Sequence, residues 1–283
     1  MLDAIAAEAL KMRRHRGTWL MVWIYPIAVF LIAAASLIYY QFAPASPPGE
    51  TQTAAAWIAD SAMFWRAPGS APGRILIAGF VALLFAGEYS WNTWKLIIPA
   101  RRRWQLVVAK WAVAVGFAFA AFVVTDLISL TTVWLRSLQG SEIPEGVTLS
   151  GIFVAHARAA AYALLPIAYA TAFAGLFAVL TRSILATVIL SIGLVIVEGM
   201  LGILGVFFHA RAPDLTRFLI ETSPPYHILN LIEWANRKTG LVSPLGPDAG
   251  VALSWTTSLV ALLIWIGLAM AITLVRFSRQ DLN

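Results

Sequence analysis

The chain contains no cysteine among its 283 residues, which excludes disulfide bonds, thiol catalysis and thiolate metal sites. It has only four histidines, and their scattered positions match no metal-binding spacing: His15, His156, His209 and His227. It also lacks a glycine-rich loop ending in Gly-Lys-Ser/Thr and a Gly-x-Ser-x-Gly segment. The sequence therefore predicts no metal site, no catalytic residues, and no nucleotide or cofactor bound by this chain itself.

Charged residues are scarce, at 12% of the chain, whereas hydrophobic residues make up 60%. A soluble domain has about 25% charged and about 45–50% apolar residues. The mean hydropathy is +0.79. This composition indicates an integral membrane protein. The net charge of +6 does not predict a nucleic-acid partner, because the charges lie at the ends of apolar segments, where they would contact membrane lipid.

Six apolar segments are long enough to cross a bilayer, which needs about 20 helical residues. We expect an all-α integral membrane protein with spans over 19–41, 74–98, 106–136, 150–180, 183–208 and 250–276. Residues 1–18 precede them as an amphipathic helix on the membrane surface, so the six-helix transmembrane domain covers 19–283. A cleaved signal peptide is the competing interpretation, with Ala43-Pro44-Ala45 as a weak cleavage site. Its apolar core over 19–40 exceeds the usual range of about 7–15 residues.

The basic residues predict the orientation. With both termini in the cytoplasm, 12 of the 20 Lys and Arg residues face inward, including the dense clusters at 11–16 and 101–103. This arrangement obeys the positive-inside rule. We therefore expect a multi-pass protein of the cell (inner) membrane.

The longest outer segment, 209–249, is predicted to form two short helices over about 213–238. Pro213 fits the first position of a helix, and Ser223-Pro224-Pro225 would end it. Gly240 is a candidate cap for the end of the second helix. These outer helices either cover a pathway or simply pack at the membrane interface.

Three ionisable residues lie inside predicted spans, where such residues are rare and often functional. At about 1.5 Å per residue, Asp126 and Glu198 are roughly 15 Å, and Arg158 roughly 12 Å, from the outer helix ends. In a structural interpretation, Arg158 pairs with Asp126 or Glu198 and fastens the bundle. In a functional one, a carboxylate faces a polar cavity and meets a cationic or proton-coupled substrate. Glu198 is preferred because glycines at 199, 202 and 205 allow close helix approach.

One short stretch follows the second predicted span and carries a recognisable pattern. It reads Glu88-Tyr89-Ser90-Trp91-Asn92-Thr93-Trp94-Lys95-Leu96, followed by Arg101-Arg102-Arg103 and Lys110. It resembles the corresponding stretch of permease subunits of bacterial and archaeal ABC exporters of the second type. The ending Arg276-Phe277-Ser278-Arg279-Gln280-Asp281-Leu282 is similar to that family's ending. Asn92 stands where glycine is usual in the family.

The resemblance implies a membrane subunit that works as a dimer, with an identical copy or a paralogue, together with two separate ATPase subunits that bind ATP and Mg. Residues 89–103 would form a coupling helix seated in a groove of the ATPase. Tyr89, Trp91 and Trp94 would fill apolar hollows. Lys95, Arg101, Arg102 and Arg103 would meet acidic rims of the partner or only anchor the chain to lipid head groups. Glu88 would pair with Lys95 or accept backbone hydrogen bonds where the surface helix begins.

The implied function is ATP-driven export of a peptide, drug or lipid-like substrate from the cytoplasm, along a path lined by the second and fifth spans. The alternative is an ion-coupled secondary transporter or channel that uses Asp126, Arg158 and Glu198 without an ATPase. Such transporters usually contain internal repeats, and none is evident in this sequence. A membrane-embedded enzyme or sensor is a third alternative.

Overall fold

The computed structural model describes residues 1–42, 52–98, 101–208, 211–246 and 249–281. Six of its helices are long and apolar enough to cross a membrane. These are α2 (Arg16–Phe42), α4 (Ala71–Ser90), α6 (Arg103–Leu138), α7 (Leu149–Thr181), α8 (Ile184–Phe208) and α11 (Trp255–Ser278). The predicted all-α membrane fold with six spans is confirmed.

Shorter elements connect the spans. They are α1 (Leu2–Arg14), α3 (Ala54–Ser61), the 3₁₀ helix η1 (Met63–Gly69), α5 (Trp94–Ile97), α9 (Pro213–Thr222), α10 (Pro224–Arg237), β1 (Val242–Gly246) and β2 (Ala249–Ala252). The α1 helix ends before His15, and the first span starts directly afterwards at Arg16. The candidate cleavage site at 43–45 lies outside the described residues.

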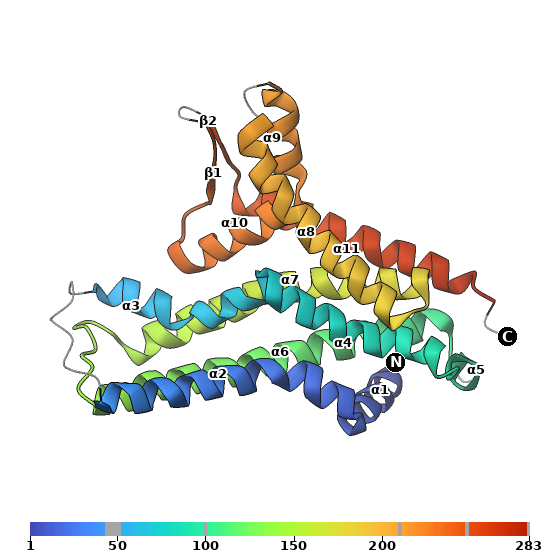
Figure 1. Cartoon of the computed structure of the whole chain (residues 1–283), viewed down its shortest axis with the longest axis horizontal. Coiled ribbons are helices and arrows are strands. Elements are labelled where there is room, and N and C mark those ends of the chain that lie inside the picture. The colour runs from blue at the N-terminus through green and yellow to red at the C-terminus, as the bar shows by residue number, and fades with distance from the viewer. Residues whose placement is uncertain (43–51, 99–100, 209–210, 247–248, 282–283) are drawn as a thin grey trace.

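Both chain termini, α1 and α5 gather at one end of the bundle, which we call the terminal end (Figure 1). The α3 helix and the α6–α7 connection lie at the opposite, distal end. The α9 helix and the β1–β2 hairpin project to one side, next to α10. An even number of spans places both termini on the same side of a membrane. The position of both termini at the terminal end agrees with six spans.

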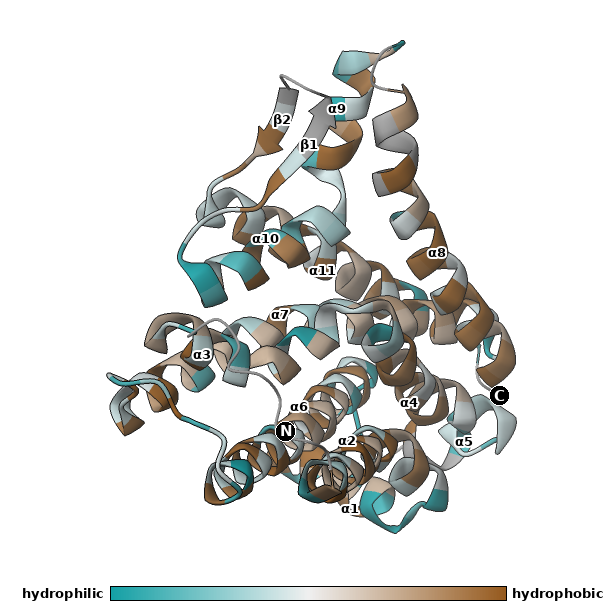
Figure 2. Ribbon diagram, turned by 60° about the vertical axis from the view of Figure 1, so that its left-hand side comes forward, coloured by the Kyte–Doolittle hydropathy of each residue, from teal (hydrophilic) through white to brown (hydrophobic). Residues whose placement is uncertain are grey.

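Helices α4 and α7 form the centre of the bundle. In each, 67% of the spanning window is buried, compared with 17% in α2 and in the described part of α8. The α7 helix packs against α4, α11, α8 and α6, while α2 packs mainly on α6. Figure 2 shows α8 coloured as hydrophobic along much of its length. The outward faces of α2 and α8 are thus left for lipid or a second subunit.

Local sequence explains where several helices begin. The side chains of Ser70, Thr148 and Ser254 accept hydrogen bonds from first-turn backbone N–H groups and cap α4, α7 and α11. Pro26 and Pro166 lie inside α2 and α7 without ending them. Membrane helices tolerate such prolines when neighbouring groups satisfy the freed backbone carbonyl.

Two local predictions on the outer segment are wrong. The sixth span begins at Trp255 rather than near 250, because 249–252 pairs with 242–246 as an antiparallel hairpin. The α10 helix ends through Lys238, whose φ of 58° is left-handed, and not through Gly240. The chain direction after the helix, which sequence spacing does not reveal, decides which residue takes that conformation.

Candidate functional site

The terminal end contains a cluster of buried charges around Glu88, on the last turn of α4. This carboxylate is fully buried and pairs with Lys110 of α6 at 2.7 Å and with Lys11 of α1. Lys110, itself 1% exposed, also pairs with Glu8 at 2.6 Å and donates to the Leu84 carbonyl oxygen. The cluster therefore joins the N-terminal helix to two spanning helices.

The same carboxylate fixes the chain just after α4. The Thr93 hydroxyl donates to Glu88, and the Thr93 backbone N–H donates to the Glu88 carbonyl oxygen. The predicted pairing of Glu88 with Lys95 is wrong, because Lys95 is exposed and the carboxylate points into the bundle. Lys95 is close in sequence, whereas the actual partners on α1 and α6 lie 77 and 22 residues away.

A second group of contacts ties this region to the C-terminal end of α11. The Tyr89 hydroxyl donates to the Gln280 side-chain oxygen at 2.6 Å, and the Gln280 amide donates to the Val179 carbonyl oxygen at 2.7 Å. Arg103 donates to the carbonyl oxygens of Ser278 at 2.9 Å and Gln280 at 2.6 Å. The negative end of the α11 helix dipole also stabilises the positive charge of Arg103 at this position. The family-like ending of the sequence thus packs against the stretch that follows α4.

The two tryptophans of the stretch have different environments. Trp94 is 2% exposed, and its ring packs at a tilt against that of Phe277, with the ring centroids 4.6 Å apart. The prediction that Trp94 fills a hollow of a partner is therefore wrong. Trp91 is 42% exposed, although one side of its ring packs near His15. Of the predicted contact residues, Trp91 is the aromatic side chain that remains well exposed.

The basic residues of this stretch also differ in their exposure to solvent. Lys95, Arg101 and Arg102 are exposed, whereas Arg103 is half-buried against α11. Arg101 lies 3.7 Å from Asp3 of α1. The exposed face of the terminal end therefore comprises Trp91, Asn92, Lys95, Arg101 and Arg102, and we call it the terminal face.

The helix predicted over 89–103 is not continuous. Instead of a helix over 89–103, α4 continues to Ser90, a turn follows, α5 has 4 residues, and α6 begins at Arg103. Asn92 adopts a left-handed φ of 55° in this turn. Glycine and asparagine are the residues that adopt this conformation most readily. This requirement explains why asparagine fits where the family usually has glycine.

The three intramembrane charges do not pair as predicted. Glu198 of α8 pairs with Arg74 of α4 at 2.5 Å and accepts a hydrogen bond from Tyr169 of α7. Arg74 and Glu198 are both buried, and the Arg74 guanidinium lies 5.9 Å from the Tyr169 ring centroid. This Arg74–Glu198–Tyr169 cluster connects the second, fourth and fifth spans.

Asp126 of α6 pairs instead with His156 of α7, at 2.8 Å. The other ring nitrogen of His156 lies 3.0 Å from the Ser61 hydroxyl, so a buried chain of polar groups links α6, α7 and α3. Arg158 makes no ion pair within the described chain and lines a separate hollow at α3 and α10, so its predicted pairing with Asp126 or Glu198 is wrong. The sequence places Arg74 at the outer start of its span and shows His156 only as an isolated histidine, so it predicts no ion pair for either.

The close helix approach predicted beside Glu198 does not occur at Gly199 within the described chain. A Cβ built there meets no atom within 4 Å, so no helix of the described chain packs closely on it. Among the residues that the structure describes, no three His, Asp or Glu side chains lie close enough to hold a metal ion.

These features define a multi-pass α-helical membrane protein with a charge cluster between its spans and a polar face at the end that holds its termini. A family model described as ABC-2 family transporter protein matches residues 4–198. The chain therefore belongs to the ABC-2 transporter family, as a membrane component. No curated protein matches the chain significantly.

Proposed function

We propose that this protein is the permease subunit of an ATP-driven exporter, and that separate ATPase subunits act on its terminal face. The observation that carries the proposal is the division of the coupling stretch into an exposed side and an anchored side. Trp91 and Lys95 are exposed, while Glu88 and Trp94 are buried in contacts with other helices. A partner pushing on the exposed side would move the anchored side with it.

The anchors determine which helices would respond. Glu88 connects the stretch to α1 and α6 through Lys11 and Lys110. Trp94 and Tyr89 connect it to the end of α11 through Phe277 and Gln280. Buried ion pairs and close aromatic packing shift as units rather than deform continuously. Movement of a short turn would therefore tilt three spans and α1 together.

The Arg74–Glu198–Tyr169 cluster is our candidate for the latch of the transport path. It holds α4 against α8, the two spans expected to line the path. Separating these helices would expose one cation and one anion that now neutralise each other. In the resting protein the paired charges keep the path closed, and in the open one they would provide polar groups for an amphipathic cargo.

A second permease copy or paralogue is expected to complete the path. The face of α8 that α4 does not cover carries exposed apolar side chains, including Leu185, Ile189, Ile196 and Ile203. A single chain leaves this face to lipid, and a dimer would cover part of it. Two ATPase subunits, one for each permease, would supply ATP and Mg binding.

The proposal is tested by co-expressing the chain with its ATPase and purifying the complex in mild detergent. The double variant Trp91→Ala/Lys95→Glu should reduce the ATPase recovered at least tenfold without lowering the melting temperature of the permease. Trp134→Ala removes a comparably exposed tryptophan at the distal end of α6 and serves as the control, with recovery unchanged. Cargo transport by the purified chain in liposomes without ATPase or ATP would overturn the proposal in favour of a secondary transporter.

The latch is tested separately with Arg74→Met/Glu198→Gln, which removes both charges. The ATPase should still bind this variant, because the terminal face is intact. ATP hydrolysis should continue with cargo transport changed by at least tenfold. Wild-type transport rates in this variant would show that the cluster only fastens the bundle.

A further inference from the structure

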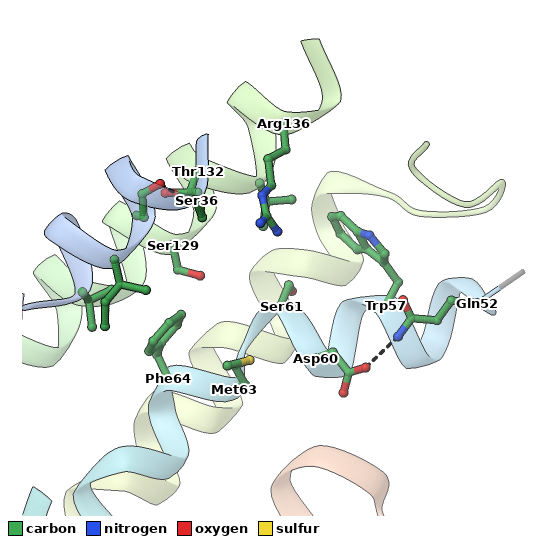
Figure 3. A pocket seen from close by; sticks show the side chains of 14 residues that line it. Ser36, Gln52, Trp57, Asp60, Ser61, Met63, Phe64, Ser129, Thr132 and Arg136 are labelled. Carbon is green, nitrogen blue, oxygen red and sulfur yellow. Dashed lines mark hydrogen bonds between the residues drawn. The ribbon is translucent and has the colours of Figure 1, made fainter. Parts of the chain in front are cut away.

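The distal end contains a cavity of about 390 Å³ whose lining includes no residue of the Glu88 cluster or of the Arg74–Glu198–Tyr169 cluster. Ser61, which contacts His156, forms part of its wall. The cavity lies between α2 and α6 on one side and α3 with η1 on the other, and it opens on the surface of the bundle (Figure 3). Its volume falls in the range of about 300–1,000 Å³ that is usual for small-molecule sites. It lies on the α2–α6 face, whereas the Arg74–Glu198–Tyr169 cluster lies among α4, α7 and α8.

The inner part of the cavity is apolar. Its wall on α2 runs from Val29 to Ser36, which corresponds to roughly 10 Å along the helix. Met63 and Phe64 of η1 face this wall, and the few polar groups there are hydroxyls such as Ser129 (Figure 3). Such a surface suits a hydrocarbon chain and offers nothing to a strongly hydrated solute.

The rim carries two charges of opposite sign. Arg136 extends from the C-terminal turn of α6 into the cavity, and Asp60 lies across from it on α3 (Figure 3). The Arg136 guanidinium lies over the Tyr40 ring at 4.1 Å, and its Nε is buried without a hydrogen-bond partner in the described chain. Asp60 accepts a hydrogen bond from the neutral Gln52 amide at 2.6 Å. Neither residue forms an ion pair with any described residue, nor do they pair with each other.

We infer that this cavity binds a membrane phospholipid with a primary amine in its head group, namely phosphatidylethanolamine. One acyl chain would occupy the apolar wall, the phosphate would contact Arg136, and the ammonium would donate to Asp60. An arginine recognises phosphate through several parallel N–H donors, and a carboxylate accepts charge-assisted hydrogen bonds from an ammonium. The aromatic rings of Tyr40 and Trp57 lie beside these charges, as is common where membrane meets water.

The two charges also discriminate among lipids. A choline head group is a cation without an N–H donor, so it gives the Asp60 carboxylate no hydrogen bond beyond the one from Gln52. A glycerol head group has no cation, so its phosphate would bind Arg136 while Asp60 remained unneutralised. The loss of one hydrogen bond to a charged group corresponds to roughly tenfold in affinity or more. The cavity is therefore expected to prefer the ethanolamine lipid over both others by about this factor.

The test is native mass spectrometry of the purified, delipidated chain with equal amounts of phosphatidylethanolamine, phosphatidylcholine or phosphatidylglycerol of the same acyl chains. No ATPase or ATP is present, so the outcome is independent of the function proposed above. The wild-type chain should retain the ethanolamine lipid about tenfold better. Asp60→Asn should abolish this preference while retaining binding, and Arg136→Gln should weaken binding of all three lipids. Arg237→Gln, which alters an exposed arginine on α10, is the control and should behave as wild type.

A third variant covers the acyl-chain portion. Ala33→Phe would place a ring in the cavity wall and should lower retention of all three lipids alike, with Asp60 and Arg136 unchanged. Equal retention of the three lipids by the wild-type chain would overturn the assignment. An ethanolamine preference that persists in Asp60→Asn would also overturn it. So would unchanged binding of all three lipids by Arg136→Gln.

Discussion

The change Glu88→Gln should destabilise this protein more than any other single isosteric substitution at the terminal end. The carboxylate is fully buried and neutralises Lys110, which is 1% exposed, and Lys11, whose side chain is 33% exposed. The glutamine has the same shape but no charge. It leaves Lys110 with Glu8 as its remaining acidic partner, at 2.6 Å.

The magnitude follows from the burial. Removing one partner of a buried ion pair costs about 3–5 kcal/mol. Because Glu8 still neutralises part of the Lys110 charge, we expect the lower end, about 3 kcal/mol. At about 2 °C per kcal/mol for a chain of this size, the melting temperature should fall by about 6 °C. The assay is the loss of the monodisperse peak on size-exclusion chromatography after heating in detergent.

Two further variants make this prediction refutable. Glu88→Leu/Lys110→Met replaces the pair by apolar groups of similar size and should recover most of the lost stability, since buried pairs are often replaced without cost. Glu233→Gln removes a half-buried carboxylate that lies 3.4 Å from the exposed Arg237 one helical turn away, and it should cost less than about 0.5 kcal/mol. If Glu88→Gln melts within 1 °C of Glu233→Gln, the cluster does not hold the terminal end together.

Three other predictions concern local structure, each measured by the same heating assay. Asn92→Gly should be nearly neutral, whereas Asn92→Val should cost about 1–2 kcal/mol because φ is 55° there; equal effects would contradict the turn geometry. A Cβ on Gly73 would lie 1.9 Å from the Ala67 carbonyl oxygen, so Gly73→Ala should yield little folded protein, while Gly79→Ala, which meets only the Met21 sulfur at 3.4 Å, should fold normally. Burial lowers the pKa of His227 below its usual 6.5, so an unfolded chain takes up a proton near pH 6 that the folded chain resists. Stability should therefore be constant above about pH 7 and fall towards pH 5.5, and His227→Gln should show a smaller fall.

Hydropathy was sufficient to predict the spans, because in lipid each apolar helix must satisfy its own backbone hydrogen bonds. The ends of the segments were less predictable. The predicted start of the last span, near 250, falls on the strand β2, whose sequence Ala-Gly-Val-Ala runs into the apolar helix that follows it. Length and composition alone do not separate a short apolar strand from a helical turn.

The chemistry of the charged residues could be predicted, but their partners could not. A charged residue in an apolar helix needs a partner, which predicts pairing for Asp126, Arg158 and Glu198. Glu88 is expected to pair from its place in the family-like stretch. The partners of Glu88, Asp126 and Glu198 come from other helices, and which helices are neighbours depends on packing that no local pattern encodes.

Likewise, Trp91 and Trp94 are equivalent by residue type. Asn92 lies between them in a left-handed conformation and changes the chain direction. As a result, Trp91 is exposed and Trp94 is buried.

The central claim is that the terminal face is where a separate ATPase acts, and site-specific photo-crosslinking tests it most directly. Because the chain has no cysteine, Lys95→Cys provides a single thiol for a benzophenone label on this face, and Ser141→Cys provides one at the distal end. With the ATPase co-expressed, the label at 95 should form a crosslinked product with it, in an amount that changes when ATP is added. The label at 141 should form none. Absence of the product at 95, or equal products at both positions, would contradict the account.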